Sequence, residues 1–224
     1  MQVVILAGGR GKRMQSLTQN IQKAMLTVSG KNLIEYKLGI LPPEVDKIVI
    51  TIGYLGEQIT GHFGDEWNGK KIHYVEQGNL EGTGHALFKA KHLLQDRFVV
   101  MMGDDIYSRE DLSECLKHPW AMLVKKSDYP GDGGKVVLDK HGHLLNIVEG
   151  SWDKNFYINT GLYVLGKEFF NYSLVQIQSG EFGLPQTLVE AAKDFDVKVV
   201  EAEWWTKITS PEDIKRVEEM LSAR

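Results

Sequence analysis

A short apolar run near the N-terminus, followed by a glycine-rich basic turn, constrains this chain more than any other feature. Residues 3–7 (VVILA) are uninterrupted apolar, as expected for a parallel strand covered on both faces. The turn after it contains three glycines and three basic residues: Gly8, Gly9, Arg10, Gly11, Lys12 and Arg13. Glycine lets backbone amides approach phosphate oxygens that a Cβ atom would hold away. Because open α/β sheets bind ligands at such strand ends, the segment predicts an α/β fold with an anion site there.

The turn matches neither of two common phosphate-binding motifs. Lys12 is followed by Arg13 rather than by the Ser or Thr of a P-loop. Met14 stands where a dinucleotide-binding motif needs its third glycine. A glycine turn after a strand is also compatible with a purely structural role. The function of the turn therefore has to be inferred from the residues that follow it.

Residues 6–25, LAGGRGKRMQSLTQNIQKAM, resemble the signature of the sugar-1-phosphate nucleotidylyltransferases, L-A-G-G-x-G-T-R-L-x-P-L-T followed by P-K-P-M. The residues in register with it are Leu6, Ala7, Gly8, Gly9, Gly11, Arg13, Leu17, Thr18, Lys23 and Met25. Lys12, Ser16 and Gln22 replace a threonine and two prolines. The resemblance implies an enzyme that joins a nucleoside triphosphate to a sugar 1-phosphate, with Mg²⁺ as cofactor. The replacements predict a less rigid loop with its polar contacts retained.

Length and composition fit one soluble domain. The chain has 224 residues, of which 42% are hydrophobic and 25% charged, enough for one sizeable core. Its net charge of -4 argues against broad binding to nucleic acid or to anionic membranes. No apolar run reaches about 18 residues and no secretory signal precedes the first strand, so we expect a cytoplasmic protein. Cys115 is the single cysteine, which excludes an internal disulfide and a thiolate metal cluster.

Strands and helices are expected to alternate along the first half of the chain. The expected strands after the first are 47–52, 71–76, 97–102 and 121–125. The expected helices are 33–41, 55–63, 86–94 and 111–116. Residues 109–111 are expected to be a solvated start of the last of these helices. This alternation predicts a Rossmann-like three-layer αβα sandwich with a mixed, mostly parallel central sheet.

From about Gly134 the expected pattern changes to short β segments. The segments 135–138, 144–148 and 157–165 predict a small antiparallel extension that carries the second substrate. A helix at 184–193, a strand at 197–201 and a helix at 211–221 follow. We expect one domain over residues 1–224, with a nucleotide-binding half at about 1–130 and a sugar-phosphate-binding half at about 131–224.

The segment QGNLEGTGHAL, residues 77–87, follows an expected strand. It resembles the base-binding segment of the same family, a glutamine followed after a short spacer by G-T-G-x-A. The resemblance implies that Gln77, Gly82 and Thr83 contact the nucleobase. A plain helix N-terminus with Thr83 as its cap is the alternative.

The segment MMGDDIY, residues 101–107, delivers two carboxylates at the end of another apolar strand. Asp104, directly after a glycine, matches the magnesium-binding aspartate of the family. Mg²⁺ suits such a place because it is held by one or two carboxylates together with substrate phosphates. Asp105 has two open interpretations, a second metal ligand or a cap for the following helix.

The second half carries a weaker resemblance. Gly134, Glu149 and Asn159 follow the order of the family's sugar-binding residues, which implies that Glu149 and Asn159 bind sugar hydroxyls. Fixed hydrogen-bonding groups are needed there because a bound sugar otherwise leaves buried polar groups unpaired. Gly150 stands where the family commonly has a lysine, so one phosphate contact is missing.

Lys207 is the largest departure from the family pattern. In WWTKITSPED it occupies the place of an aspartate that serves the family as second magnesium ligand. A protonated lysine has donors alone and cannot bind Mg²⁺. Our hypothesis is that Lys207 contacts a phosphate, leaving Asp104 as the principal metal carboxylate. The alternative is that Lys207 points into solvent.

The resemblance implies in-line attack of the sugar phosphate on the α-phosphorus of the nucleotide. Arg13, Lys23 and Asp104 are the expected catalytic residues: Arg13 on the β and γ phosphates, Lys23 between the reacting phosphates, and Asp104 on Mg²⁺. Two alternatives stay open. The ending K-I-T-x-P-E-D also resembles the methylerythritol-phosphate cytidylyltransferases. Lys207 and Gly150 are also compatible with a catalytically weak nucleotide-sugar-binding protein.

Overall fold

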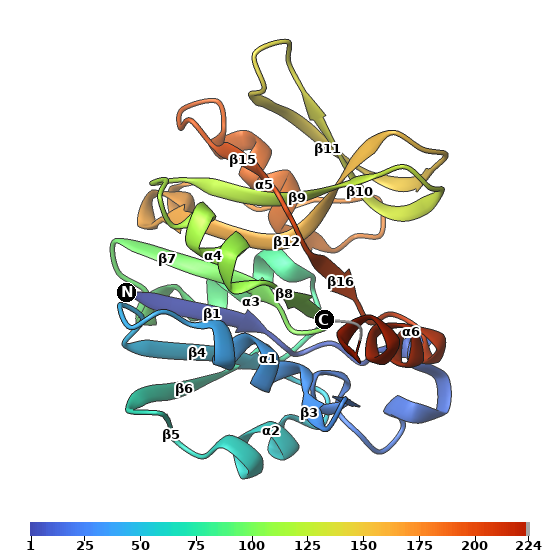
Figure 1. Ribbon diagram of the computed structural model, residues 1–224. Coiled ribbons are helices and arrows are strands. Elements are labelled where there is room, and N and C mark those ends of the chain that lie inside the picture. Colours follow the sequence, from blue (N-terminus) through green and yellow to red (C-terminus); the bar gives the residue numbers. More distant parts are fainter. Residues whose placement is uncertain (223–224) are drawn as a thin grey trace.

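Four parallel strands form the centre of the protein in the computed structural model, which describes residues 1–222 (Figure 1). They lie in the order β7 (Arg97–Met102), β1 (Gln2–Leu6), β4 (Lys47–Ile52) and β6 (Lys70–Glu76). Val3, Val4 and Ile5 of β1 are fully buried. The central strand is therefore covered on both faces, as its apolar run predicts.

Antiparallel strands extend this sheet beyond β7. They are β12 (Phe156–Gly166), β10 (Gly131–Leu138), β11 (Leu144–Trp152) and β9 (Ala121–Ser127). β12 runs antiparallel to β7, β9 and β10, and β10 pairs antiparallel with β11. β15 (Lys198–Glu201) adds a parallel strand beside β9, and β5 (Glu66–Trp67) closes the opposite edge beside β6. The result is the predicted mixed sheet with an antiparallel extension.

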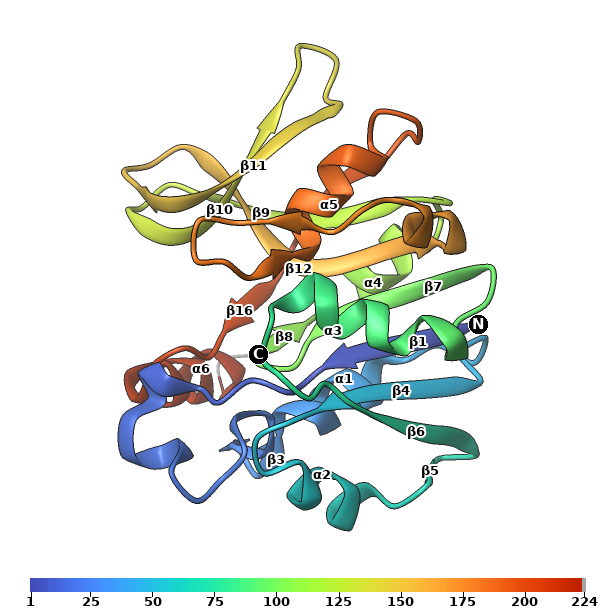
Figure 2. The ribbon, with the colours of Figure 1, turned by 180° about the vertical axis from the view of Figure 1, so that it is seen from behind.

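Helices cover both faces of the sheet, which confirms the predicted three layers. One face packs against α1 (Leu33–Ile40), α2 (Gly56–Phe63) and α4 (Arg109–Cys115). The other packs against α3 (Thr83–Ala90) and α5 (Leu184–Ala191), which Figure 2 shows in front. α1 begins with a capping box, in which Asn32 accepts from the amide of Glu35 and the Glu35 carboxylate accepts from the amide of Asn32.

A third, smaller apolar cluster joins the two ends of the chain. α6 (Pro211–Ser222) contributes Val217 to it, η1 (Lys12–Thr18) contributes Met14, and the ribbon of β8 (Asp105–Tyr107) with β16 (Trp205–Lys207) contributes Ile106. The remaining short elements are β2 (Thr27–Val28), β3 (Lys31–Asn32), β13 (Val175–Gln176), β14 (Phe182–Gly183), η2 (Lys23–Met25), η3 (Lys91–Leu93) and η4 (Lys167–Asn171). The sequence analysis predicted none of these short strands.

Several local expectations differ from the structure. α3 begins at Thr83, three residues earlier than predicted, and Gly82 holds the N-cap position, which excludes the alternative in which Thr83 is the cap. Asp105 does not cap α4, because it lies within β8 and Ser108 accepts the amide of Asp111 instead. Asp111 is buried rather than solvated, since its carboxylate accepts the backbone amides of Glu203 and Trp204.

Residues 1–222 contain no helix with the length and apolarity needed to cross a lipid bilayer.

Candidate active site

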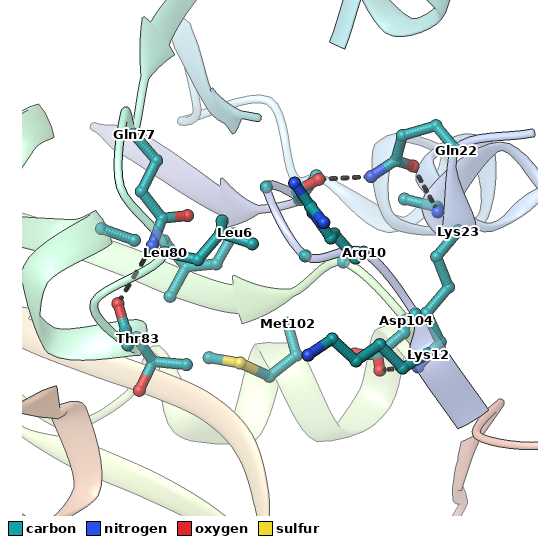
Figure 3. Close-up of a pocket in the computed structure, with 18 of the residues that line it drawn as sticks. Leu6, Arg10, Lys12, Gln22, Lys23, Gln77, Leu80, Thr83, Met102 and Asp104 are labelled. Atoms are coloured by element: carbon teal, nitrogen blue, oxygen red, sulfur yellow. Dashed lines mark hydrogen bonds and ion pairs between the residues drawn. The ribbon is translucent and has the colours of Figure 1, made fainter. Parts of the chain in front are cut away.

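A cavity of about 480 Å³ opens where β1, β6 and β7 end. It is lined by all nine residues predicted to bind a nucleotide: Leu6, Ala7, Gly8, Gly9, Gly11, Lys12, Gln77, Gly82 and Thr83. Lys23 and Asp104 line it too. Figure 3 shows Gln77, Leu80 and Thr83 on one side of this first cavity and the Lys23–Asp104 pair on the other. The sheet thus brings together segments that lie up to about a hundred residues apart.

Two glycines of the first turn are required by close contacts. A Cβ atom at Gly8 would lie 2.4 Å from Oε1 of Gln77. Gly11 has φ of +63°, and a Cβ there would meet the aliphatic stem of Lys23 at 3.0 Å. These glycines therefore let Gln77 and Lys23 reach their places beside the turn.

Gln22 fixes the loop at the position where the family signature has a proline. Its side chain is buried, donates to the carbonyl of Ala7 and accepts from the amide of Ala24. Its backbone amide donates to Oε1 of Gln58 at 2.8 Å. The sequence analysis expected a looser loop here, but these hydrogen bonds tie it to β1 and α2.

Gln77 and Thr83 are both held in place at the other end of the cavity. The buried Gln77 side chain donates from Nε2 to the carbonyl of Gly82 at 3.2 Å. Oγ1 of Thr83 accepts the amide of Leu184, the first residue of α5, at 3.1 Å. The predicted base-binding segment is thereby connected to the second half of the chain.

Lys23 and Asp104 form an ion pair between Nζ and Oδ2. Lys23 is 9% exposed and comes from η2, whereas Asp104 follows β7. Burial raises the pKa of Asp104, but the Lys23 ammonium outweighs this and holds the pKa below its ordinary value. Asp104 is therefore an ionised carboxylate at neutral pH, ready for a cation.

Asp105 lies in a different environment from its neighbour. Its side chain is 7% exposed, and its Oδ2 accepts from the hydroxyl of Tyr107 at 3.3 Å. Burial and the adjacent charge of Asp104 raise the pKa of Asp105 well above its ordinary value. The same burial, with the charge of Asp105, raises the pKa of Tyr107. This carboxyl is suited to a structural hydrogen bond more than to a metal.

A second cavity of about 610 Å³ adjoins the first. Four residues line both cavities: Thr83, Met102, Asp104 and Glu181. The four residues predicted to bind the sugar phosphate, Gly134, Glu149, Asn159 and Lys207, all line the second cavity. The two predicted sites are therefore neighbours, and Asp104 lies between them.

Strand pairing positions Gly134 and Glu149, and hydrogen bonds with the Tyr163 hydroxyl position Asn159. Gly134 of β10 lies opposite Glu149 of β11, and a Cβ at Gly134 would approach Oε1 of Glu149 to 2.9 Å. The Asn159 side chain donates to the hydroxyl of Tyr163 at 2.6 Å and accepts from it at 3.0 Å. Tyr163 is fully buried and is one of the residues that line the second cavity. The Tyr163 hydroxyl fixes the orientation of the Asn159 side chain, a contact that the sequence did not predict.

Arg13 and Lys207 are the cationic side chains among the described residues that line the second cavity. Lys207 donates from Nζ to the carbonyl of Asp132 at 2.7 Å, which tethers β16 to β10. Arg13 lines the second cavity and not the first, so it lies on the sugar-phosphate side and not beside the β and γ phosphates of the nucleotide, where the resemblance had placed it. Lys207 therefore keeps a fixed place at the second cavity instead of extending freely into solvent.

The chain's donor set fits a magnesium ion that substrate phosphates help to hold. Within residues 1–222, no three His, Cys, Asp or Glu side chains are grouped so that they could bind a metal by themselves. Asp104 offers one ionised carboxylate at the junction of the cavities, where a cationic group already lies beside it. Mg²⁺ is commonly bound by one or two carboxylates plus phosphate oxygens.

The sequence analysis did not identify two charged residues of the site, Glu181 and Lys37. Glu181, in the loop between β13 and β14, lines both cavities. Lys37 of α1 is fully buried next to the turn that carries Asp104. Burial lowers the pKa of Lys37 to about 8, against the charges of Asp105 and Asp104, which raise it. Neither position carried a motif that could have indicated its place.

Comparison with known sequences gives a consistent picture. The family described as nucleotidyl transferase matches residues 2–222. The bifunctional protein GlmU of Methanocaldococcus jannaschii is 32% identical over 99% of this chain, and the match covers 54% of GlmU. The UTP–glucose-1-phosphate uridylyltransferase AglF of Haloferax volcanii is 28% identical over 99% of this chain and 96% of AglF. The chain thus spans about half the length of the GlmU relatives.

Solved structures share the fold. A putative glucose-1-phosphate thymidylyltransferase from Bacillus anthracis, in complex with a sucrose, superposes with a TM-score of 0.86 at 24% identity, covering 98% of this chain and 94% of the other. HddC from Yersinia pseudotuberculosis superposes with a TM-score of 0.73, also at 24% identity, covering 98% of this chain and 99% of HddC.

Proposed function

This chain belongs to the nucleotidyl transferase family, and on that premise we propose that it joins a nucleoside triphosphate to a sugar 1-phosphate, releasing pyrophosphate. One observation carries the proposal: two cavities meet at Asp104, and the Lys23 ammonium contacts that carboxylate. The first cavity contains the nine residues that the resemblance assigned to nucleotide binding and the second contains the four assigned to the sugar phosphate; Arg13, assigned to the nucleotide's β and γ phosphates, is the exception and lines the second. Residues 1–130 and 131–224 would accordingly form the nucleotide half and the sugar-phosphate half.

The first cavity would bind the nucleotide. Gln77 and the backbone of residues 82–83 would pair with the base at one end, where the Gln77 amide is already oriented by Gly82. The amides of the turn at residues 8–11 would bind the triphosphate at the other end. The cationic side chains that line this cavity, Arg10, Lys12 and Lys23, would balance the phosphate charge.

The reaction would be an in-line displacement at the α-phosphorus. An oxygen of the sugar phosphate forms the new P–O bond, and the bond to the β-phosphate breaks as pyrophosphate leaves. Because a phosphate monoester is mostly dianionic at neutral pH, with a second pKa near ~6, no general base is required. Lys23 would leave Asp104 and move its ammonium between the two reacting phosphates, holding them together and offsetting their repulsion.

Mg²⁺, bound by Asp104 and the substrate phosphates, would add positive charge against the triphosphate oxygens. Arg13 and Lys207 would bind the phosphate of the second substrate, since they supply the cationic groups of the second cavity. Glu149 and Asn159 would bind sugar hydroxyls. Lys207 would thus contribute fixed charge where Gly150 offers no side chain.

The substrate pair we propose is a hexose 1-phosphate with UTP or dTTP. It rests on the activities for which AglF and the Bacillus protein are named, both of which concern glucose 1-phosphate. The match covers 96% of AglF, which supports the same choice.

Pyrophosphate release would test this proposal. Five nucleoside triphosphates are each combined with Mg²⁺ and a panel of sugar 1-phosphates, with methylerythritol phosphate as the non-sugar acceptor. We expect one strong pair that contains a sugar 1-phosphate. Turnover with CTP and methylerythritol phosphate alone would replace the proposal by the cytidylyltransferase alternative. Tight nucleotide-sugar binding without any turnover would replace it by a binding protein.

A further inference from the structure

Lys37 carries a charge that the proposed reaction does not use. It lies on α1, its side chain is 0% exposed, and it touches no cavity wall. A buried ammonium is strongly unfavourable unless all of its donors are hydrogen-bonded. A lysine kept at such a position therefore needs a specific set of acceptors.

The acceptors are three backbone carbonyls. Nζ of Lys37 donates to Leu33 in its own helix at 3.0 Å, to Gly103 at 3.0 Å, and to Asp105. These bonds use all three protons of the ammonium. Two of the three acceptors are the residues on either side of Asp104. The third carbonyl of this turn, that of Asp104 itself, accepts the amide of Ile208 at 3.0 Å.

The turn is consequently held through its backbone groups, and the Asp104 carboxylate remains available for other contacts. The amide of Gly103 donates to the carbonyl of Leu6 at 2.9 Å, which joins the turn to β1. Lys37 joins it to α1, and Ile208 joins it to the segment after β16. Among the three residues of the turn, Asp104 is the one whose side chain lines both cavities and pairs with Lys23.

Lys37 also supplies a counter-charge that does not move toward the cavities. Two carboxyl groups, Asp104 and Asp105, follow each other in the chain, and two ammonium groups face them. Lys23 would turn toward phosphates once substrates bind. Lys37 is fully buried and lines neither cavity, so its ammonium stays behind the turn.

We propose that Lys37 is a positioning residue, whose ammonium fixes the turn at residues 103–105 so that Asp104 presents its carboxylate to a divalent cation. This inference rests on the proposed function, because it takes Asp104 to be the metal carboxylate. It assigns a role to a side chain that touches neither substrate nor metal.

The decisive variant is Lys37→Met, which keeps the length of the side chain and removes its charge and donors. Mn²⁺ replaces Mg²⁺ as the probe, and a nucleoside triphosphate is present because its phosphates complete the proposed metal site. The dissociation constant of Mn²⁺ from the protein–nucleotide complex is measured by electron paramagnetic resonance and corrected for Mn²⁺ bound to nucleotide alone. Loss of a group that orients a metal ligand weakens metal binding by about 10- to 100-fold, and we expect a change in this range. Loss of a nearby positive charge alone would instead tighten the binding of a cation. The direction of the change therefore separates positioning from simple electrostatics.

Lys70→Met is the matched control. Lys70 also donates to two backbone carbonyls, those of Pro42 and Val45, but at the far edge of the sheet. It should leave Mn²⁺ binding unchanged. Urea unfolding of both variants checks that the comparison is made between folded proteins. If Lys37→Met does not fold, Lys37→Gln, which keeps a shorter donor, takes its place with the same expected direction.

Unchanged or tighter Mn²⁺ binding in the folded Lys37 variant would overturn the inference. A wild-type protein that binds no Mn²⁺ even with a nucleoside triphosphate present would overturn the metal role of Asp104, and this inference with it. Normal wild-type Mn²⁺ binding without turnover of any substrate pair would contradict the proposed function alone. A measurement on the wild-type protein adds to these results. In nuclear magnetic resonance, the Nζ protons of Lys37 should exchange slowly with water, and its ¹⁵Nζ should show hydrogen-bond couplings to the carbonyl carbons of residues 103 and 105. Absence of these couplings would also contradict the inference.

Discussion

The two cavities are built from different parts of the chain. The first includes the glycine turn that follows a parallel strand, where Gly8 and Gly11 allow close approach. The second is formed by side chains that project from antiparallel strands, such as Glu149 and Asn159. A backbone site depends on glycines in a fixed order, whereas a side-chain site can change one residue at a time. The difference explains why the first cavity leaves a recognisable signature and the second a weak one.

Charge divides the cavities in the same way. The cationic side chains that line the first are Arg10, Lys12 and Lys23, and its carboxylates are Asp104 and Glu181. The second has Arg13 and Lys207 with the carboxylates Asp104, Asp105, Asp132, Glu149 and Glu181. The first cavity therefore suits a polyanion such as a triphosphate, and the second suits a ligand with one phosphate and many hydroxyl donors.

Lys23→Ala should have the largest effect, because Lys23 is proposed to serve both cavities at their junction. We expect kcat to fall on the order of 10²-fold or more, as is typical when a preorganised charge is removed. Pyrophosphate release measures it, and circular dichroism checks that the fold is intact. Lys71→Ala, at an exposed position of β6, is the control. Near-normal turnover of Lys23→Ala would show that the junction does not carry the chemistry.

Gly8→Ala tests the backbone character of the first cavity. Its Cβ would lie 2.4 Å from Oε1 of Gln77 and displace that side chain. We expect the KM for the nucleotide to rise about tenfold, equivalent to about 1.4 kcal/mol, with the KM for the sugar phosphate nearly unchanged. Gly61→Ala, where nothing lies within 4 Å, should leave both constants unchanged. Equal effects on the two substrates would show that the cavities do not act separately.

Glu149→Gln tests the side-chain character of the second cavity. The variant keeps the shape and one acceptor but loses the charge, so the KM for the sugar phosphate should rise by about three- to tenfold. The KM for the nucleotide should not change. Steady-state kinetics with each substrate varied in turn gives both values, and Glu57→Gln on the exposed side of α2 is the control. A change confined to the nucleotide would reverse the assignment of the cavities.

Asp213→Asn should have the smallest effect, on stability rather than on substrate binding. Asp213 accepts the amides of Thr209 and Ser210 and pairs with Arg216. Burial raises its pKa, but these contacts, led by Arg216, lower the pKa from 3.8 to about 2. A lowered pKa stabilises the folded state above pH 4, and this contribution is lost as the pH falls from about 4 to about 2.

We expect Asp213→Asn to lower the free energy of unfolding at pH 7 by about 1 kcal/mol, as for the loss of a helix cap. Urea unfolding at pH 7 and at pH 3 measures it, and the difference between the wild type and the variant should shrink at the lower pH. A difference that grows on acidification would show that the carboxylate is not the stabilising form.

The central sheet and the first cavity could be predicted from the sequence for physical reasons. A buried parallel strand needs an uninterrupted apolar run, and β1, β4 and β7 each have one. Gly8 and Gly11 of the first turn are required by contacts in three dimensions, and both belong to the local motif that the sequence shows. The nine predicted nucleotide-binding positions all line one cavity for this reason.

Other features depend on contacts between distant segments and left no local pattern. The ribbon of β8 and β16 consists of three-residue strands, which are too short to show periodicity. Asp111 resembles a solvated helix start, yet its partners are amides more than 90 residues away. Lys37 gives no sign in the sequence that its acceptors lie at residues 103 and 105. Gln22 compensates for a missing proline through side-chain bonds that a pattern of loop residues does not predict.

The shared lining of the two cavities has a kinetic consequence for the proposed reaction. Thr83, Met102, Asp104 and Glu181 belong to both, so no wall divides the substrates. The nucleotide sugar would span the junction and make the contacts of both substrates as one molecule. It would lose rotational and translational freedom once, whereas the two separate substrates lose it twice, so we expect it to bind tightly. Its release, rather than the displacement at phosphorus, is then the step expected to limit turnover and to respond to accumulated product.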